Sequence, residues 1–110
     1  MSADLTRGLE LIRRLYQRAD GLMAEAEEAI NSGDVEAARP PLLKAQEVIS
    51  ELLKALDFEK GGELAENLRR LYIFVWERLV LASLSGDLRS LGEARAVWTK
   101  LAAAWEEVDA

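Results

Sequence analysis

Residues 57–76, DFEKGGELAENLRRLYIFVW, contain a helix joint followed by the first turns of a new helix. The pair Gly61-Gly62 interrupts the helical pattern. The acidic residues that follow favour a helix start, because carboxylates stabilise the positive end of the helix dipole. Residues 71–76 then carry no charge. A helix that is apolar on every side needs cover on every side, so this stretch raises the question of what covers it.

Two further joints have the same tripeptide, Ser-Gly-Asp, at residues 32–34 and 85–87. In each, the glycine suits the left-handed conformation that ends a helix, and the aspartate suits the cap of the next helix. Together with the joint at residues 57–62, they divide the chain into four helical segments. Because short joints make neighbouring helices antiparallel, the sequence predicts an all-α fold, an antiparallel up-down-up-down four-helix bundle, as one domain over residues 1–110.

Apolar residues recur at spacings of three and four within the segments, which places them on one face of each helix. We expect both Trp98 and Trp105 to pack in the core for this reason. The predicted inner stripes are Leu5, Leu9, Ile12, Tyr16, Ala19, Met23, Ala26 and Ile30, then Val48, Ile49, Leu52, Leu53 and Leu56, then Leu64, Leu68, Leu71, Val75, Leu79 and Ala82, and finally Leu91, Ala94, Trp98, Leu101, Trp105 and Val108.

The pair Pro40-Pro41 conflicts with a helix that starts at the Asp34 cap, two turns earlier. A proline inside a helix costs about 3 kcal/mol, because it lacks the N–H and clashes with the preceding turn. Either the second helix begins near Pro40, with residues 34–38 as a separate short turn, or it is kinked there. Proline is favourable at the first helical position, so we predict the later start.

The composition excludes several classes of chemistry. The chain has 110 residues, enough for one domain, and a formal net charge of −6, which disfavours nucleic acid as a partner. It contains no cysteine and no histidine, so thiolate chemistry and histidine-based acid–base catalysis are excluded. The many carboxylates are typical of solvated helix faces. We therefore expect no enzymatic activity, no metal and no cofactor.

The first ten residues, MSADLTRGLE, have neither a basic flank nor an apolar run, so we expect no signal peptide. No apolar run approaches the roughly 20 residues needed to span a bilayer. A cytoplasmic protein without membrane insertion is the expectation.

The opening stretch also carries a resemblance. Residues 56–68, LDFEKGGELAENL, followed by Leu71-Tyr72 and Arg78-Leu79, resemble the signature of the FliS family of flagellar secretion chaperones. The resemblance extends over nearly the whole chain. Its further matches are Leu15-Tyr16, Ala29-Ile30, Gly33-Asp34, LLKAQEVI at residues 42–49, and Trp105.

The resemblance implies a cytosolic four-helix bundle that binds the disordered C-terminal segment of flagellin, prevents premature polymerisation and helps present it for export. The implied partner is the flagellin C-terminal region or another amphipathic helical client. Such a client folds as it binds, so the chaperone has to keep apolar surface available outside its own core.

This sequence departs from the family pattern at four places. The family usually has an N-terminal extension that carries a tyrosine, whereas this chain begins almost at the predicted helix, so we expect that self-capping element to be absent. Ile73 stands where a polar residue is common, and Ala82-Ser83 replaces an Ala-Asn pair. The pair Pro40-Pro41 lies where the family continues a helix. These departures bear on the identity of the client more than on the fold.

The third helix leaves an apolar outer face when its predicted stripe points inward. Contiguous exposed apolar surface usually marks an interface. Neighbouring helices of the bundle are one alternative that would cover this face. A second copy of the chain is another, and the protein would then be a homodimeric helical structural or adaptor module with a different protein partner. The predicted partner-binding residues are Asn67, Tyr72, Ile73, Trp76, Val80, Leu81 and Leu84, and the dimer alternative would bury Ile73, Trp76 and Leu81.

Overall fold

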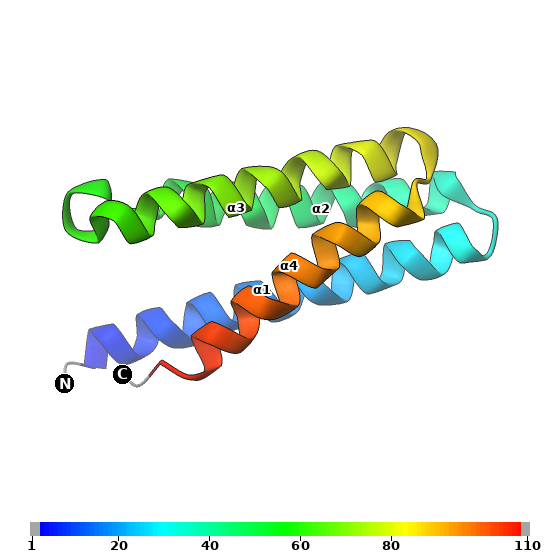
Figure 1. Ribbon diagram of the computed structural model, residues 1–110. Coiled ribbons are helices and arrows are strands. Elements are labelled where there is room, and N and C mark those ends of the chain that lie inside the picture. The colour runs from blue at the N-terminus through cyan, green and yellow to red at the C-terminus, as the bar shows by residue number, and fades with distance from the viewer. Residues whose placement is uncertain (1–2, 109–110) are drawn as a thin grey trace.

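The computed structural model describes the backbone of residues 3–108 and the side chains of residues 8–108. Four helices follow one another (Figure 1): α1 (Ala3–Asn31), α2 (Val35–Lys54), α3 (Phe58–Ser85) and α4 (Leu88–Glu106). Within the described residues the backbone of each helix lies close to two neighbours in the cyclic order α1, α2, α3, α4, and the backbones of the diagonal pairs lie farther apart. The α1–α2 and α3–α4 joints lie at one end and the α2–α3 joint at the other. The antiparallel four-helix bundle is thus confirmed.

Both Ser-Gly-Asp joints have the predicted chemistry. Gly33 and Gly86 have positive φ angles of 84° and 69°, the left-handed conformation that favours glycine. Asp34 accepts a hydrogen bond from the backbone N–H of Ala37 at 3.0 Å. Asp87 likewise accepts from the first turn of α4, at 3.0 Å from the Arg89 N–H. Each joint therefore ends one helix and caps the next within three residues.

The α2–α3 joint is also where the sequence places it. Asp57 accepts hydrogen bonds from the backbone N–H groups of Glu59 and Lys60, both at 3.1 Å. One helical turn follows, and Gly62 then breaks it with φ 49° and ψ −122°. The regular part of α3 begins after this break, at the acidic residues that favour a helix start.

The predicted late start of the second helix is wrong. α2 begins at Val35, directly after the Asp34 cap, and holds the pair Pro40-Pro41 within it. The prolines leave the carbonyls of Glu36 and Ala37, four residues earlier, without a helical N–H. Both residues are exposed, so water can satisfy these carbonyls, and this lowers the cost of the two prolines.

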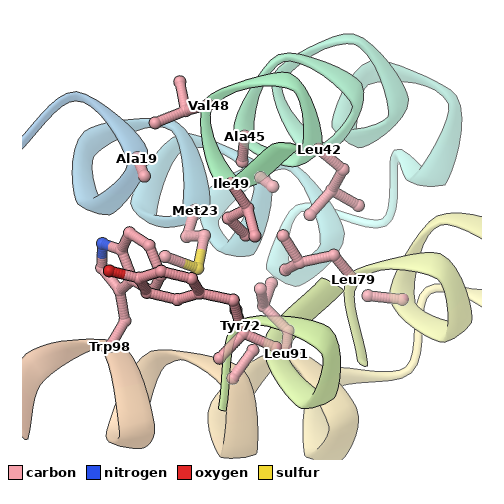
Figure 2. Close-up of a cluster of buried hydrophobic side chains, with 14 of the residues drawn as sticks. Ala19, Met23, Leu42, Ala45, Val48, Ile49, Tyr72, Leu79, Leu91 and Trp98 are labelled. Atoms are coloured by element: carbon pink, nitrogen blue, oxygen red, sulfur yellow. The ribbon is translucent and has the colours of Figure 1, made fainter. Parts of the chain in front are cut away.

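The core lies along the inner faces of all four helices (Figure 2). Its largest fully buried side chains include Trp98, Tyr16 and Tyr72. The predicted core position of Trp98 is confirmed, and Trp105 is partly buried against the same cluster. Leu5, assigned to the inner stripe of the first helix, lies outside the described side chains.

The predicted inner stripe of α3 is wrong at its first turns. Leu64 is 65% exposed and Leu71 is also exposed, whereas Tyr72 is only 2% exposed. The buried stripe is Ala65, Tyr72, Val75, Leu79 and Ala82. The large tyrosine ring takes the inner position and turns the leucines toward the surface beside α4.

Candidate partner-binding surface

An aromatic cluster supports the surface of α3 from beneath. The hydroxyls of Tyr16 and Tyr72 are hydrogen-bonded at 2.6 Å, and the Tyr16 ring stacks on Trp98 with centroids 4.4 Å apart. The indole N–H of Trp98 donates to the Tyr16 carbonyl at 3.1 Å. Burial disfavours the phenolate form and raises the pKa of both tyrosines above the ordinary value. Both hydroxyls are therefore neutral and pair with each other inside the bundle.

The seven predicted site residues fall into three places in the structure. Tyr72 lies in the core and so contributes to the surface only as support. Asn67 faces the seam between α3 and α4. The other five follow one side and the outer face of α3, where Ile73 and Val80 are half-buried and the remaining three are exposed: Trp76, Leu81 and Leu84.

The outer part of α3 has a shallow hollow of about 290 Å³. Trp76, Val80 and Leu81 line it together with Glu77 and Arg78. Leu84 is 70% exposed and lies one turn beyond the hollow. Within the described residues this face therefore presents large apolar side chains that no other helix of the bundle covers, as the sequence predicted for an interface.

A second apolar surface was not predicted. The α3–α4 groove, a cavity of about 260 Å³, is almost entirely apolar. The leucines that point outward at the start of α3, Leu64 and Leu71, form one wall. The groove forms because α3 is rotated relative to the predicted stripe, which places Leu64 and Leu71 at the surface. Its lining residues are Leu64, Asn67, Leu68, Leu71, Leu101, Ala104, Trp105 and Val108.

A larger cavity, of about 560 Å³, lies at the end of the bundle next to the α2–α3 joint. Leu68 and Trp105 line both this end cavity and the α3–α4 groove. Arg13 of α1 fixes Trp105 from the other side, because its guanidinium donates to the Trp105 carbonyl at 3.0 and 3.2 Å and also to the Val108 carbonyl. This clamp adds side-chain donors at the C-terminus of α4, where the Trp105 carbonyl also accepts from the Val108 N–H at 3.3 Å.

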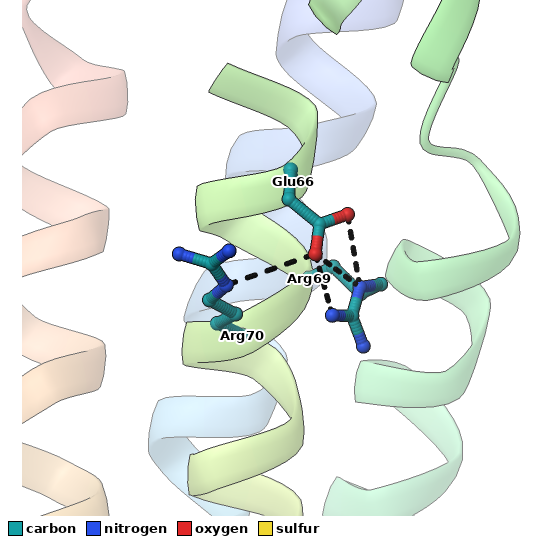
Figure 3. Close-up of polar contacts among 3 residues, drawn as sticks. All are labelled: Glu66, Arg69 and Arg70. Carbon is teal, nitrogen blue, oxygen red and sulfur yellow. Dashed lines mark hydrogen bonds and ion pairs between the residues drawn. The ribbon is translucent and has the colours of Figure 1, made fainter. Parts of the chain in front are cut away.

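A charged group occupies the early turns of the outer face of α3. Glu66 pairs with Arg69 and lies 3.7 Å from Arg70, as Figure 3 shows. The hydrogen bond from Arg69 holds the pKa of the Glu66 carboxyl below its usual range. Arg69 points toward α2 and Arg70 toward the opposite side. The apolar part of the outer face therefore lies beyond these turns, at the hollow lined by Trp76, Val80 and Leu81.

The chemistry of these surfaces suits the binding of apolar side chains of a partner. In the part of the chain that the structure describes, no helix is long and apolar enough to cross a membrane.

Comparison with known proteins agrees with this picture. Residues 3–110 match the family model for flagellar protein FliS. The chain is 37% identical over 100 residues to the flagellar secretion chaperone FliS of Salmonella typhimurium, covering 90% of this chain and 74% of that protein. It is 36% identical over 98 residues to the flagellar secretion chaperone FliSB of Pseudomonas aeruginosa, covering 89% and 78%.

The flagellar secretion chaperone FliS of Campylobacter jejuni is 34% identical over 99 residues, 90% of this chain and 77% of that protein. These relatives are named as secretion chaperones, which are not enzymes. The family match covers almost the whole chain, and the bundle fold agrees with it. The chain therefore belongs to the FliS family of flagellar proteins.

Proposed function

We propose that this chain is a cytoplasmic export chaperone that binds the disordered C-terminal segment of flagellin, prevents its premature polymerisation and aids its secretion. The observation that carries the proposal is the uncovered apolar outer face of α3 in a member of the FliS family. A disordered segment that folds onto apolar surface offsets its ordering entropy by burial, and while bound it is not free to polymerise.

The predicted contact residues on this face are Ile73, Trp76, Val80, Leu81 and Leu84. Asn67 would contact the client from the α3–α4 groove, and Tyr72 would hold the surface in shape from the core. The exposed residues have no role in the bundle core, which favours a role in binding.

Calorimetric titration with a flagellin C-terminal peptide tests the proposal. We expect a 1:1 complex with the wild-type chain. The double substitution Leu81→Glu and Leu84→Glu should weaken binding at least tenfold, because it buries two charges against an apolar client. The melting temperature should change little, since both side chains are exposed.

Leu11→Glu is the matched control, because Leu11 is an exposed leucine on α1, which lies diagonally across the bundle from α3. Its affinity for the peptide should equal that of the wild type. The absence of heat with the wild-type chain would reject the proposed function. A stable dimer in light scattering that excludes the peptide would favour the homodimeric adaptor module instead.

A further inference from the structure

Arg78 of α3 keeps a hydrogen-bond donor out of water without an acceptor for it. Within the described residues its Nε is buried and has no hydrogen-bond partner. By contrast, the Nε atoms of Arg13, Arg39 and Arg69 each donate to a carbonyl or carboxylate oxygen, at 3.2, 3.0 and 3.1 Å. A buried donor without an acceptor destabilises a protein, so the position of Arg78 needs an explanation.

An aromatic ring holds the guanidinium of Arg78 in place. Its central carbon lies 4.9 Å from the centroid of the Phe74 ring, one turn earlier on α3. The attraction between a cation and a ring orders the guanidinium without using any of its N–H groups. The Arg78 side chain is 34% exposed. The guanidinium is therefore ordered in the free chain, and part of it reaches the surface.

Glu93 of α4 does not satisfy Arg78. Its Oε2 lies 3.7 Å from the Nε of Arg78, which is too far for a hydrogen bond. Its Oε1 lies 3.7 Å from the Nε of Arg89. Two arginines therefore share one carboxylate, which accepts a hydrogen bond from the Nε of neither. This part of the α3–α4 seam carries two positive charges and one negative charge.

Arg78 also lines the hollow on the outer face of α3. Successive residues of a helix are about 100° apart, so Glu77 and Arg78 stand on opposite sides of Leu81, one turn later. The contact with Glu93 places Arg78 on the side next to α4. The hollow therefore has an apolar floor, a cation on its α4 side and an anion on the other. The floor is made by Trp76, Val80 and Leu81.

We infer that Arg78 binds an aspartate or glutamate side chain of the client, next to an apolar residue that fills the hollow. This inference rests on the proposed function and specifies the chemistry of the flagellin segment that crosses this site. A carboxylate accepts two charge-assisted hydrogen bonds from one guanidinium. Glu77 repels a carboxylate on the other side of the hollow, so the client carboxylate lies toward α4.

The apolar face of α3 continues on both sides of the hollow. Ile73 is half-buried one turn before it, and Leu84 is 70% exposed one turn beyond it. A client segment that follows this face passes through the hollow and does not end there. The carboxylate at Arg78 is therefore that of a side chain and not the C-terminal carboxylate of the client.

Arg78→Gln tests the site by calorimetric titration with the flagellin C-terminal peptide. Affinity should fall about 5- to 20-fold, the value of charge-assisted hydrogen bonds at a partly exposed site. Arg78→Lys keeps the charge but lacks the planar fork, so it should recover only part of the loss. Arg89→Gln is the matched control, because it makes the same charge change beside Glu93 at a residue outside the lining of the hollow. Its affinity should stay within about twofold of the wild type.

Substitutions in the peptide identify the carboxylate. Each aspartate or glutamate is changed in turn to asparagine or glutamine, and the C-terminal carboxylate is changed to an amide. One side-chain change should weaken binding to the wild-type chain about 5- to 20-fold and have little further effect on Arg78→Gln, whose partner group is already absent. A general disturbance of the fold in Arg78→Gln would not produce this coupling, because it would weaken all peptides alike.

Glu93→Gln tests whether Arg78 serves only the α3–α4 seam. It removes the carboxylate that attracts Arg78 in the free chain, so binding of the peptide should tighten about 2- to 3-fold at low salt. Weaker binding would show that the pair with Glu93 is the role of Arg78, and would overturn the inference.

Three further results would overturn it. They are wild-type affinity in Arg78→Gln, equal losses in Arg78→Gln and Arg89→Gln, and coupling of Arg78 to the C-terminal carboxylate or to no carboxylate of the peptide. Failure of the wild-type chain to bind the peptide would instead reject the proposed function itself, and the inference with it.

Discussion

At the scale of single residues, the Tyr16–Tyr72 pair shows how the bundle accommodates polar atoms in its core. One short hydrogen bond joins the two hydroxyls between α1 and α3, whose backbones lie diagonally across the bundle. Because each hydroxyl is the partner of the other, the two residues act as a unit.

The pair should show strong coupling in a double-mutant cycle. Tyr16→Phe should lower the free energy of unfolding by about 1–3 kcal/mol, because it leaves the Tyr72 hydroxyl buried and unpaired. Tyr72→Phe should cost a similar amount, and the double variant clearly less than the sum, since no hydroxyl then lacks a partner. Urea denaturation measures all three. Additive losses would show that water or another group satisfies the hydroxyls separately.

At the scale of elements, the two Ser-Gly-Asp joints look identical in sequence but differ in their surroundings. A Cβ added at Gly33 would meet nothing within 4 Å, whereas one at Gly86 would come within 2.7 Å of a methyl group of Val35. The α3–α4 joint therefore packs against the start of α2, next to the α1–α2 joint.

The substitution Gly33→Ala should cost about 1 kcal/mol of unfolding free energy, the value of a left-handed conformation for alanine. Gly86→Ala carries the same conformational cost and adds the overlap with Val35, so it should cost about 2–4 kcal/mol. Thermal unfolding of the two single variants checks the difference. Equal shifts in melting temperature would mean that the Val35 side chain moves away from the added Cβ without a loss of unfolding free energy.

Sequence patterns predicted these joints because each depends on a few adjacent residues. The start of α2 could not be predicted this way, since the cost of Pro40-Pro41 depends on whether the freed carbonyls reach water. The apolar spacing of α3 also could not predict which side of this helix faces the core. Leu64 and Tyr72 are both apolar candidates for the inner face, and the partners on α1 and α4 decide between them.

At the scale of the whole molecule, the sequence predicted the bundle and the exposure of Trp76, Leu81 and Leu84, but not the division of the surface. The α3–α4 groove and the cleft between α2 and α3 at Trp76 each combine residues from two helices. Their lining depends on the rotation of both helices. The apolar pattern of α3 alone therefore indicated an exposed apolar surface. It did not indicate the grooves that α3 forms with α2 and with α4.

The clamp from Arg13 to the end of α4 has a consequence for folding kinetics. The seams α1–α2, α2–α3 and α3–α4 join helices that are adjacent in the chain and close over short loops. The α1–α4 seam joins residues 92 positions apart, as in the Arg13–Trp105 contact. Closing that long loop costs the most chain entropy, so we expect this seam to form after the folding transition state.

Arg13→Met keeps the aliphatic stem and removes the hydrogen bonds, so it should speed unfolding about tenfold and leave the folding rate nearly unchanged. Stopped-flow measurements in urea separate the two rates, and a slower folding rate would place the seam in the nucleus instead. The seam that closes last also bounds the end cavity. Transient release of the last turn of α4 would then set how often that cavity opens in the native protein.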